Sequence, residues 1–415
     1  MKSYRMTERS IRHIIIGSGA AGFGAAARLH QLGERDLAIV TENISAGTSR
    51  NTGSDKQTYY KLSLAGADAD SILNMAQDLF AGQCVDGDLA LCEAALSAQC
   101  FYRLVELGVP FPCNEYGEFV GYKTDHDRGR RATSAGPYTS KVMTEKLEAD
   151  VRSRGVEILD GLQAIRLLVQ QEHIRAVLCL DLHKTRDDGI PCYQLLFCEN
   201  CILATGGPAG IYQDSVYPQS QLGSSGLAFE AGIRGKNLTE WQYGMASLSP
   251  RWNVSGTYMQ VLPRVVSTAE DGSDEREFLL DFFGDAGHMQ SMLFLKGYQW
   301  PFDVNKIFGG SSVIDLLVYR ERCLLGRRVF LDYRTNSQGR GIDFSGLCRE
   351  AFEYLHSAHA CFGTPIQRLE HMNQPAVDFY KEHGVDLHAQ MLEIAICAQH
   401  NNGGLATDSH WQPNV

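Results

Sequence analysis

The chain has 415 residues, of which 44% are hydrophobic and 21% are charged, and its formal net charge is −11 at pH 7. This composition is typical of a soluble globular protein, and the length predicts two domains because a single core rarely serves more than about 250–300 residues. The acidic balance and the absence of a dense basic run argue against nucleic acid as a partner. The polar N-terminus lacks the apolar core of a signal peptide, and no later apolar stretch is long enough to span a membrane, so we expect a cytoplasmic protein.

The strongest pattern in the chain lies in residues 14–42. It begins with an apolar run, residues 14–16, which predicts a buried parallel strand. Glycines in the spacing G-x-G-x-x-G follow this run, at Gly17, Gly19 and Gly22. Such glycines allow a tight turn and let the backbone approach a pyrophosphate closely. The spacing therefore predicts a phosphate-binding turn.

Three further features extend this turn into a dinucleotide site. A helix with many small side chains is predicted over residues 20–31, and the N-terminus of such a helix stabilises the charge of a pyrophosphate. A second apolar strand, residues 37–40, leads to Glu42, whose carboxylate can accept hydrogen bonds from a ribose diol. We therefore predict a dinucleotide site, although this motif alone does not separate FAD from NAD.

A loop rich in glycine and hydroxyl groups, residues 47–61, follows closely enough to wrap the same ligand. Two helices are predicted over residues 69–108, with Asp86 or Asp88 capping the second, and another helix is predicted over residues 138–154. The basic segment between them is either an anion-binding loop that faces the cofactor or substrate, or a solvated loop.

Strand-like segments dominate the next part of the chain. A small antiparallel meander is predicted from four pieces separated by polar turns, at residues 156–159, 163–169, 174–182 and 192–198. A final strand, residues 201–204, ends in Thr205-Gly206-Gly207, where the backbone again has the freedom to pack against a ligand. Another glycine-to-helix start lies at residues 223–232.

The twelve cysteines are scattered through the chain, and the one C-x-x-C pair is Cys198 and Cys201. A zinc site would need a second pair or nearby histidines, and a redox pair would need a helix N-terminus. This pair lies in an apolar, strand-like run, so we expect buried thiols and no metal.

The character of the sequence changes between residues 235 and 376, where the fingerprint-type glycines disappear, and this segment predicts an inserted second domain. Within it, a helix at residues 312–325 leads to a strand at residues 328–332. The segment 390–408 then places His400 after an apolar strand and just before a glycine pair.

These motifs, in this order, resemble the flavoprotein family of succinate dehydrogenase, fumarate reductase and L-aspartate oxidase over nearly the whole chain. The segments that carry the resemblance are residues 14–42, the loop 48–54, CILATGGPAGIY (201–212), SSGLAFEAG (224–232), GRRVFLDYR (326–334) and EIAICAQHNNGGLATD (393–408). The resemblance implies an α/β fold: a Rossmann-like FAD-binding domain with a parallel sheet and an antiparallel β-meander (residues 1–235), plus an inserted α+β capping domain (236–376). Residues 377–415 would return to the first domain, incomplete at its C-terminus.

The resemblance also implies FAD as the cofactor. Carried over residue by residue, the family's FAD contacts fall on Gly17, Ser18, Gly19, Ala20, Ala21, Gly22, Glu42, Asn43, Thr48, Ser49, Thr52, Gly53, Ser54, Ala164, Ala204, Thr205, Gly206, Gly207 and Ser225. Members that attach FAD covalently use a histidine in the loop after the second strand. Residues 43–60 contain no histidine, so we expect noncovalent binding.

Two departures from the family concern the substrate. The QFHPT-like segment that supplies a substrate-binding histidine is replaced by WQYGMASLSPR, residues 241–251, and the proton-donating arginine is absent from residues 310–312. His400 is the one catalytic group that is clearly retained; the alternative is a core histidine bound to a backbone carbonyl. Planar guanidinium groups suit carboxylates, so three arginines are candidates to bind a substrate carboxylate: Arg264, Arg130 and Arg131.

We therefore expect an FAD-dependent oxidoreductase that transfers a hydride between the flavin and a small unsaturated or carboxylate-bearing substrate other than fumarate or succinate. The alternative is a flavin-binding protein that has lost dicarboxylate chemistry, or one subunit of a redox complex. An NAD-dependent dehydrogenase is disfavoured because it has no place for the ATGG and His-Gly-Gly elements. The family continues beyond the point that corresponds to Val415, so we expect further sequence, or a second chain or electron-transfer partner, to complete the flavin pocket.

Overall fold

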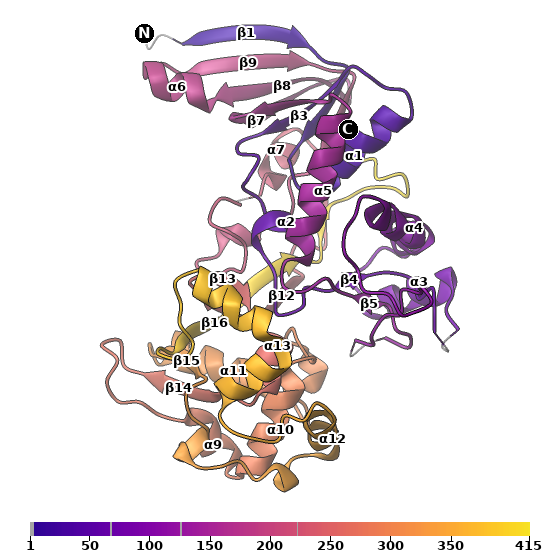
Figure 1. The fold of residues 1–415 in the computed structure, drawn as a ribbon. Coiled ribbons are helices and arrows are strands. Elements are labelled where there is room, and N and C mark those ends of the chain that lie inside the picture. The colour runs from indigo at the N-terminus through magenta and orange to yellow at the C-terminus, as the bar shows by residue number, and fades with distance from the viewer. Residues whose placement is uncertain (1–3, 67–68, 125–126, 222) are drawn as a thin grey trace.

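The computed structural model describes residues 4–66, 69–124, 127–221 and 223–415. A lobe with two sheets lies at one end of the molecule, and a lobe rich in helices lies at the other (Figure 1). A smaller unit built on two helices lies beside them. Among the described residues, no helix is long and apolar enough to cross a membrane.

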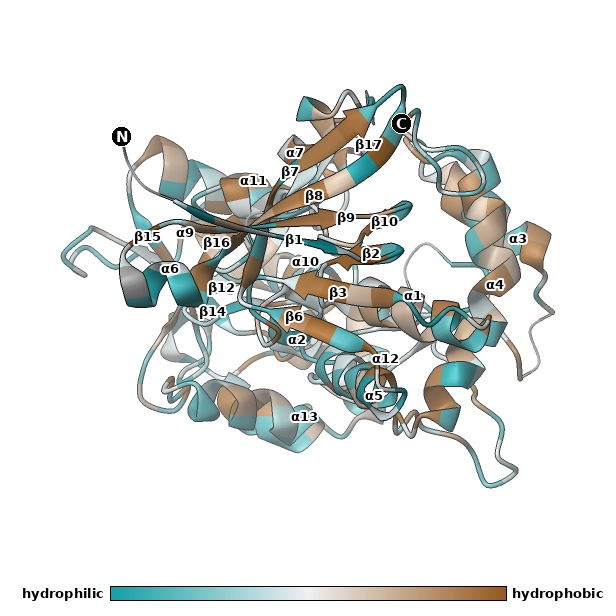
Figure 2. Ribbon diagram, turned by 90° about the horizontal axis from the view of Figure 1, so that it is seen from above, coloured by the Kyte–Doolittle hydropathy of each residue, from teal (hydrophilic) through white to brown (hydrophobic). Residues whose placement is uncertain are grey.

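A four-stranded sheet with all neighbours parallel forms the centre of the first lobe. Its two central strands are buried along their whole length, as the apolar runs in the sequence predict (Figure 2). One face packs against Phe23 and Ala26 of helix α1 (Ala20–Gln31) and against Leu147 and Val151 of helix α5 (Thr139–Ser153). In spatial order the strands are β10 (Asn200–Leu203), β2 (His13–Ile16), β3 (Leu37–Thr41) and β6 (Glu157–Asp160).

The other face of this sheet packs against a second four-stranded sheet. The predicted meander is confirmed for three of its strands, whereas residues 156–159, placed in the meander by the sequence, form β6 of the parallel sheet. An exposed polar strand, β1, was not predicted; it runs parallel to β9 and is bound through its backbone. The spatial order is β1 (Arg5–Ser10), β9 (Cys192–Phe197), β8 (His173–Asp181) and β7 (Leu162–Gln170).

The smaller unit confirms the two helices predicted over residues 69–108. Ser71 caps the first helix, and Asp86 caps the second by accepting the backbone N–H groups of Asp88 and Leu89. Shorter elements connect this unit and the glycine-rich segments to the sheets. Their bounds are α3 (Ile72–Ala81), α4 (Gly87–Glu106), α2 (Thr48–Asn51), α6 (Leu182–Asp188), α7 (Ser225–Glu230), β4 (Tyr59–Tyr60), β5 (Ala132–Thr133), β11 (Gly235–Lys236) and β17 (Gly404–Leu405).

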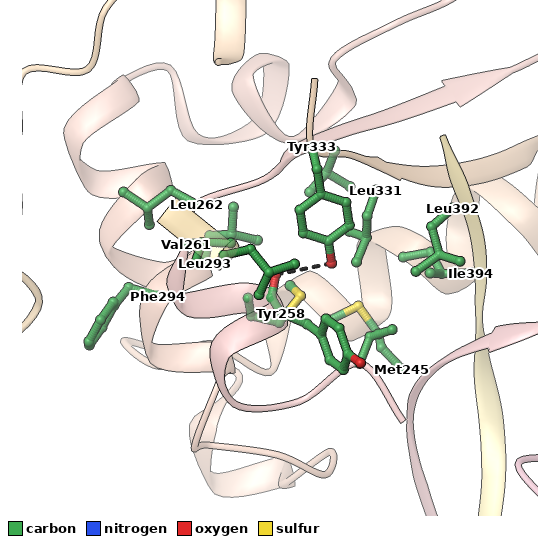
Figure 3. Close-up of a cluster of buried hydrophobic side chains, with 14 of the residues drawn as sticks. Met245, Tyr258, Val261, Leu262, Leu293, Phe294, Leu331, Tyr333, Leu392 and Ile394 are labelled. Carbon is green, nitrogen blue, oxygen red and sulfur yellow. Dashed lines mark hydrogen bonds between the residues drawn. The ribbon is translucent and has the colours of Figure 1, made fainter. Parts of the chain in front are cut away.

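The second lobe, hereafter the cap, is a five-stranded antiparallel sheet covered by helices. Figure 3 shows its core, in which the Tyr333 hydroxyl donates to the backbone carbonyl of Tyr258 at 3.2 Å among buried aliphatic side chains. The strands, in spatial order, are β13 (Arg251–Asn253), β12 (Trp241–Leu248), β16 (Leu392–Asn401), β15 (Arg328–Asp332) and β14 (Arg264–Thr268). The helices are α8 (Thr257–Gln260), α9 (Phe278–Phe283), α10 (Ala286–Lys296), α11 (Val313–Tyr319) with a π-helical continuation (Arg320–Leu324), α12 (Arg349–Ser357) and α13 (Pro365–Glu382).

The chain returns from the cap to the first lobe through strand β16. Leu392 and Ile394, near its start, are buried in the core of the cap, whereas its last two residues reach the cavity described below. The boundary predicted at residue 376 falls inside helix α13, which is part of the cap. The chain therefore passes from the cap to the first lobe within strand β16.

A buried carboxylate joins the loop after α2 to the cap. Asp55 accepts hydrogen bonds from the backbone N–H and the hydroxyl of Thr257, at 2.7 and 2.5 Å. Asn373 donates to the same hydroxyl at 2.8 Å. Gly256 has a positive φ of 57°, and a Cβ there would lie less than 3.0 Å from the Asp55 carboxylate. Desolvation raises the pKa of Asp55, so this junction is held by a carboxyl group that burial makes less acidic.

Candidate functional site

A cavity of about 2000 Å³ lies at the carboxyl ends of β2, β3 and β10, and β16 reaches it from the cap. Ligands of open α/β sheets bind at this edge, because the strand ends and the helix N-termini meet there. The cavity brings the glycine fingerprint and His400 together.

The turn from β2 into α1 is packed too closely for side chains. Gly17 has a φ of +115°, and a Cβ on it would lie less than 3.0 Å from the carbonyl oxygen of Ala204. A Cβ on Gly22 would lie equally close to the carbonyl oxygen of Gly17. Hydrogen bonds from Gly17 N to Val40 O and from Ala204 N to Ile16 O, at 2.9 and 2.8 Å, fix the three strand ends. The turn therefore presents backbone to the cavity.

The N-terminus of α1 faces this cavity without a side-chain cap. Gly19 is the N-cap residue, no acidic residue lies in the first turn, and the Ala20 N–H makes only a long contact of 3.3 Å to Ser49 Oγ. The Thr48 hydroxyl, on the cavity wall, is buried and has no hydrogen-bond partner within the described part of the chain. Free N–H groups and an unpaired hydroxyl are the groups that a bound pyrophosphate or ribityl chain would satisfy.

Glu42 lies directly after β3, on the cavity wall. Its Oε1 accepts a hydrogen bond from Gln163 Nε2 at 2.8 Å, which orients the carboxylate. Desolvation by the surrounding protein raises the pKa of Glu42, and the Gln163 hydrogen bond opposes that change. A held carboxylate at this strand end is the acceptor expected for a ribose diol.

We expect Glu42→Gln to weaken flavin binding about tenfold or more, because a charge-assisted hydrogen bond contributes about 1.5–3 kcal/mol. Flavin titration of the apoprotein, followed by fluorescence, measures this change. Glu34→Gln is the matched control, since Glu34 lies outside the cavity and contacts Arg12 and His13. Equal affinities for the two variants would remove Glu42 from the site.

His400 is the penultimate residue of β16, so it lies within the strand that the sequence placed before it. Its register partner is Gln242 of β12. The side chain is exposed to the cavity, and this position disfavours the alternative of a buried core histidine. Desolvation lowers the pKa of His400, and a contact with Asn402 opposes this only in part. The imidazole is therefore neutral at pH 7 and can donate one hydrogen bond.

None of the three candidate arginines lines this cavity. Arg131 is 1% exposed and is ion-paired with Asp70 at 2.7 Å, Asp78 at 2.7 Å and Asp127 at 3.2 Å. This corrects the hypothesis for Arg131, because its guanidinium is already saturated inside the small helical unit.

Arg264 lies on β14 of the cap, where it binds Asp332 at 2.8 Å and Glu275 at 2.7 Å. Arg130 is an exposed residue of the basic segment. Neither lines this cavity, so a role for either in binding a substrate carboxylate stays a prediction.

Most of the residues predicted to bind the cofactor are brought together on the cavity wall: Gly17, Ser18, Gly19, Ala20, Ala21, Glu42, Asn43, Thr48, Ser49, Ala164, Ala204, Thr205, Gly206, Gly207 and Ser225. Gly22 instead supports the turn from behind. Thr52, Gly53 and Ser54 are not on the wall. A Cβ on Gly53 would lie less than 3.0 Å from the ring of Trp252, so this part of the loop packs against the cap.

Several wall residues were not identified from the sequence, including Gln163, Tyr217, Gln221 and Lys236. Gln221 Nε2 donates to the carbonyl of Thr205 and so holds the ATGG turn. No local motif marks these residues. Gln163 could have been found as the neighbour of Ala164 on a strand that begins beside Glu42.

A family model described as an FAD binding domain matches residues 12–269, which is more than half of the chain. The chain belongs to this family of FAD-binding domains. The predicted cofactor and the predicted flavoprotein family are thereby confirmed.

The relatives of this FAD-binding chain are longer than the chain itself. L-aspartate oxidase of Agrobacterium fabrum is 24% identical over 408 residues, 97% of this chain and 65% of the relative. L-aspartate oxidase of Mesorhizobium japonicum is 29% identical over 233 residues, 55% of this chain and 42% of the relative. A structure described as quinol-fumarate reductase with menaquinol molecules has a TM-score of 0.67 at 14% identity, over 99% of this chain and 64% of that one. The last similarity concerns the fold.

The residues of the FAD-binding domain fit an FAD molecule. The backbone of residues 17–19 and the first turn of α1 would hold the pyrophosphate, and Glu42 would hold the ribose. The unpaired Thr48 hydroxyl adds a polar group that needs a partner.

Proposed function

We propose that the chain is the FAD-binding part of an oxidoreductase that acts on a small substrate with a polarised carbon–carbon double bond, and that fumarate and succinate are not its substrates. The observation that carries this proposal is the position of His400, a neutral histidine exposed to the cavity of the FAD-binding lobe and held by the sheet of the cap.

When bound, FAD would supply the exchange of a hydride with a substrate carbon. The role of the protein chain is to orient the substrate and to stabilise charge on it. A neutral imidazole at His400 can donate a hydrogen bond to a substrate carbonyl oxygen, and this interaction strengthens as negative charge develops on that oxygen. The hydrogen bonds from Thr257 to Asp55 join the cap to the loop after α2.

The charges on the cavity wall oppose a dicarboxylate substrate. Among the described residues on the wall there is no arginine, and the one lysine, Lys236, is ion-paired with Asp86 at 2.7 Å. Two carboxylates would enter without guanidinium partners, which is unfavourable because ionised groups need paired charges when they leave water.

The second candidate is a flavin-binding subunit that passes electrons to a partner without dicarboxylate chemistry of its own. The same lack of arginines favours it. The two candidates differ in whether a small acceptor can reoxidise the bound flavin.

The test is to purify the protein with its flavin, reduce it anaerobically, and follow reoxidation by unsaturated acids and ketones in a stopped-flow instrument. We expect reoxidation by an unsaturated ketone, slowed about 100-fold in His400→Ala with flavin content unchanged, as expected for the loss of one such hydrogen-bond donor. His356→Ala is the control, because His356 is an exposed residue of α12 in the cap and is not on the cavity wall. Absence of flavin would overturn the proposal, and flavin that no acceptor reoxidises would favour the second candidate.

A further inference from the structure

Tyr217 lies on the wall of the cavity, with its ring buried and its hydroxyl at the ATGG turn. The side chain is 8% exposed and belongs to a small apolar cluster with Val216, Ala395 and Ala398. A Cβ on Gly207 would lie 3.2 Å from the Tyr217 hydroxyl, and both residues line the cavity. The hydroxyl therefore lies beside backbone that is predicted to contact the cofactor.

The Tyr217 hydroxyl has no hydrogen-bond partner within the described part of the chain. The hydrogen bonds of this residue involve its backbone: the N–H donates to Ser215 Oγ at 3.1 Å, and the carbonyl accepts from Arg251 at 2.8 Å. Buried phenols normally find a partner in the protein, in water or in a ligand. Desolvation raises the pKa of Tyr217, so the phenol keeps its proton at pH 7. The wall thus presents a neutral hydroxyl whose proton is available to a bound molecule.

The cap holds the segment that carries Tyr217. Arg251 of β13 binds the carbonyl of Tyr217, and Ala398 of β16 forms a parallel bridge with Ser215. Tyr217 lies two residues beyond this bridge on one segment, and His400 lies two residues beyond it on the other. Because the two segments run in the same direction, both residues follow the bridge toward the cavity, which each of them lines. The cap therefore presents two neutral hydrogen-bonding groups to one cavity.

Reduction of a polarised double bond needs a proton as well as a hydride. When a hydride adds to the β-carbon of an unsaturated ketone, negative charge develops on the carbonyl oxygen, and the α-carbon must then take a proton. The proposed hydrogen bond from His400 serves the oxygen. Lys236, another proton-bearing group of the wall, is ion-paired with Asp86 at 2.7 Å. The proton of the Tyr217 hydroxyl has no such partner among the described residues.

We propose that Tyr217 donates the proton in this reaction. A hydride, supplied when reduced FAD is bound, forms the new C–H bond at the β-carbon. The electron pair of the double bond then forms an enolate, whose oxygen accepts the hydrogen bond from His400. The α-carbon of the enolate takes the Oη proton of Tyr217, and water returns a proton to the phenolate. The substrate gains two electrons and two protons, and the cofactor is left oxidised. This inference rests on the proposed function and adds a residue to it.

The test compares the wild type with Tyr217→Phe, which removes the hydroxyl and keeps the ring. The flavin-loaded proteins are reduced anaerobically and mixed with 2-methyl-2-cyclohexen-1-one in a stopped-flow instrument. We expect the limiting rate of flavin reoxidation to fall about 100-fold or more, because general acid catalysis contributes at least this much. Titration of the oxidised proteins with the ketone, followed by flavin absorption, should give dissociation constants within about twofold of each other.

The configuration of the product gives a second measurement. The α-carbon of the reduced ketone carries the methyl group and is a stereocentre. A proton donor fixed on one wall delivers its proton to one face, so the wild type should form one enantiomer in excess. In Tyr217→Phe the proton must come from water, and the excess should fall. Tyr212→Phe is the matched control, because Tyr212 lies on the same segment, is 36% exposed and does not line the cavity.

The outcomes distinguish this inference from the proposed function. A protein without flavin, or one whose flavin no acceptor reoxidises, would overturn both. If the ketone reoxidises the flavin of the wild type and of Tyr217→Phe at equal rates, only the role of Tyr217 is overturned. A loss of flavin or of ketone binding in Tyr217→Phe would do the same, because the hydroxyl would then serve binding. If Tyr217→Phe fails to fold, the wild-type product still decides, since a racemic product excludes a fixed donor.

Discussion

Replacing Gly22 by alanine is expected to abolish flavin retention and to lower the free energy of unfolding by about 3 kcal/mol, the upper part of the range for overpacking. The added Cβ would lie less than 3.0 Å from the carbonyl oxygen of Gly17. That oxygen belongs to the turn between β2 and α1, which is fixed on its other side by Ala204, so it cannot move away without displacing the phosphate-binding backbone. Flavin content after purification and urea unfolding measure the two effects.

Gly24→Ala provides the matched control on the same helix. No heavy atom lies within 4 Å of the position that its Cβ would occupy. We expect this variant to retain flavin and to gain about 0.5–1 kcal/mol, because alanine has the higher helix propensity. Wild-type flavin content in Gly22→Ala would show that the turn tolerates a side chain there.

Replacing Arg131 by methionine is expected to destabilise the protein by about 3–5 kcal/mol, because it leaves Asp70, Asp78 and Asp127 as buried carboxylates without their common partner. Arg128→Met is the control: within the described part of the chain Arg128 pairs with Asp78 alone, its side chain is 65% exposed, and the expected loss is below about 1 kcal/mol. Equilibrium unfolding compares the two. A small loss for Arg131→Met together with normal folding would reopen a functional role for this arginine.

The Arg131 effect should depend on pH. Burial by itself would raise the pKa of Asp70, but hydrogen bonds from Arg131, Ser63 and Ser71 hold it below its ordinary value. A carboxyl group whose pKa is lower in the folded state contributes stability above its unfolded pKa, and this contribution is lost as the pH falls through the folded value. The wild-type advantage over Arg131→Met should therefore be greatest near neutral pH and shrink below about pH 4.

Helices and strands that depend on residues close together in the sequence were predicted well. Helix α1 and strand β3 follow from apolar runs and glycines within residues 14–42, and the capping of α4 by Asp86 follows from one side chain. Strand β1 could not be predicted, since its residues are polar and exposed and it is bound to β9 by backbone groups alone. The place of β6 was missed because four residues do not reveal which strand they will pair with.

The residues of the candidate site also fall into those that could be predicted from the sequence and those that could not. The spacing of glycines in the sequence predicts where the backbone can contact a phosphate. The structure brings most of the predicted cofactor-binding residues to one wall of the cavity. For Arg131 and Arg264, the residue type reveals the charge but not the ion-pair partners. Asp70 lies 61 residues from Arg131 in the chain, and Asp332 lies 68 residues from Arg264.

Strand β16 has a consequence for protein engineering. In the sequence, the cap resembles a domain inserted between two parts of a cofactor-binding domain. Inserted domains are natural targets for exchange between related proteins. Excision at residues 235 and 376 would cut α13 and would strip β16 of both its neighbours, β12 and β15. The strand that presents His400 would then lose its support. A transplantable cap must carry β16 with it, and with β16 it carries His400, the residue proposed to act on the substrate.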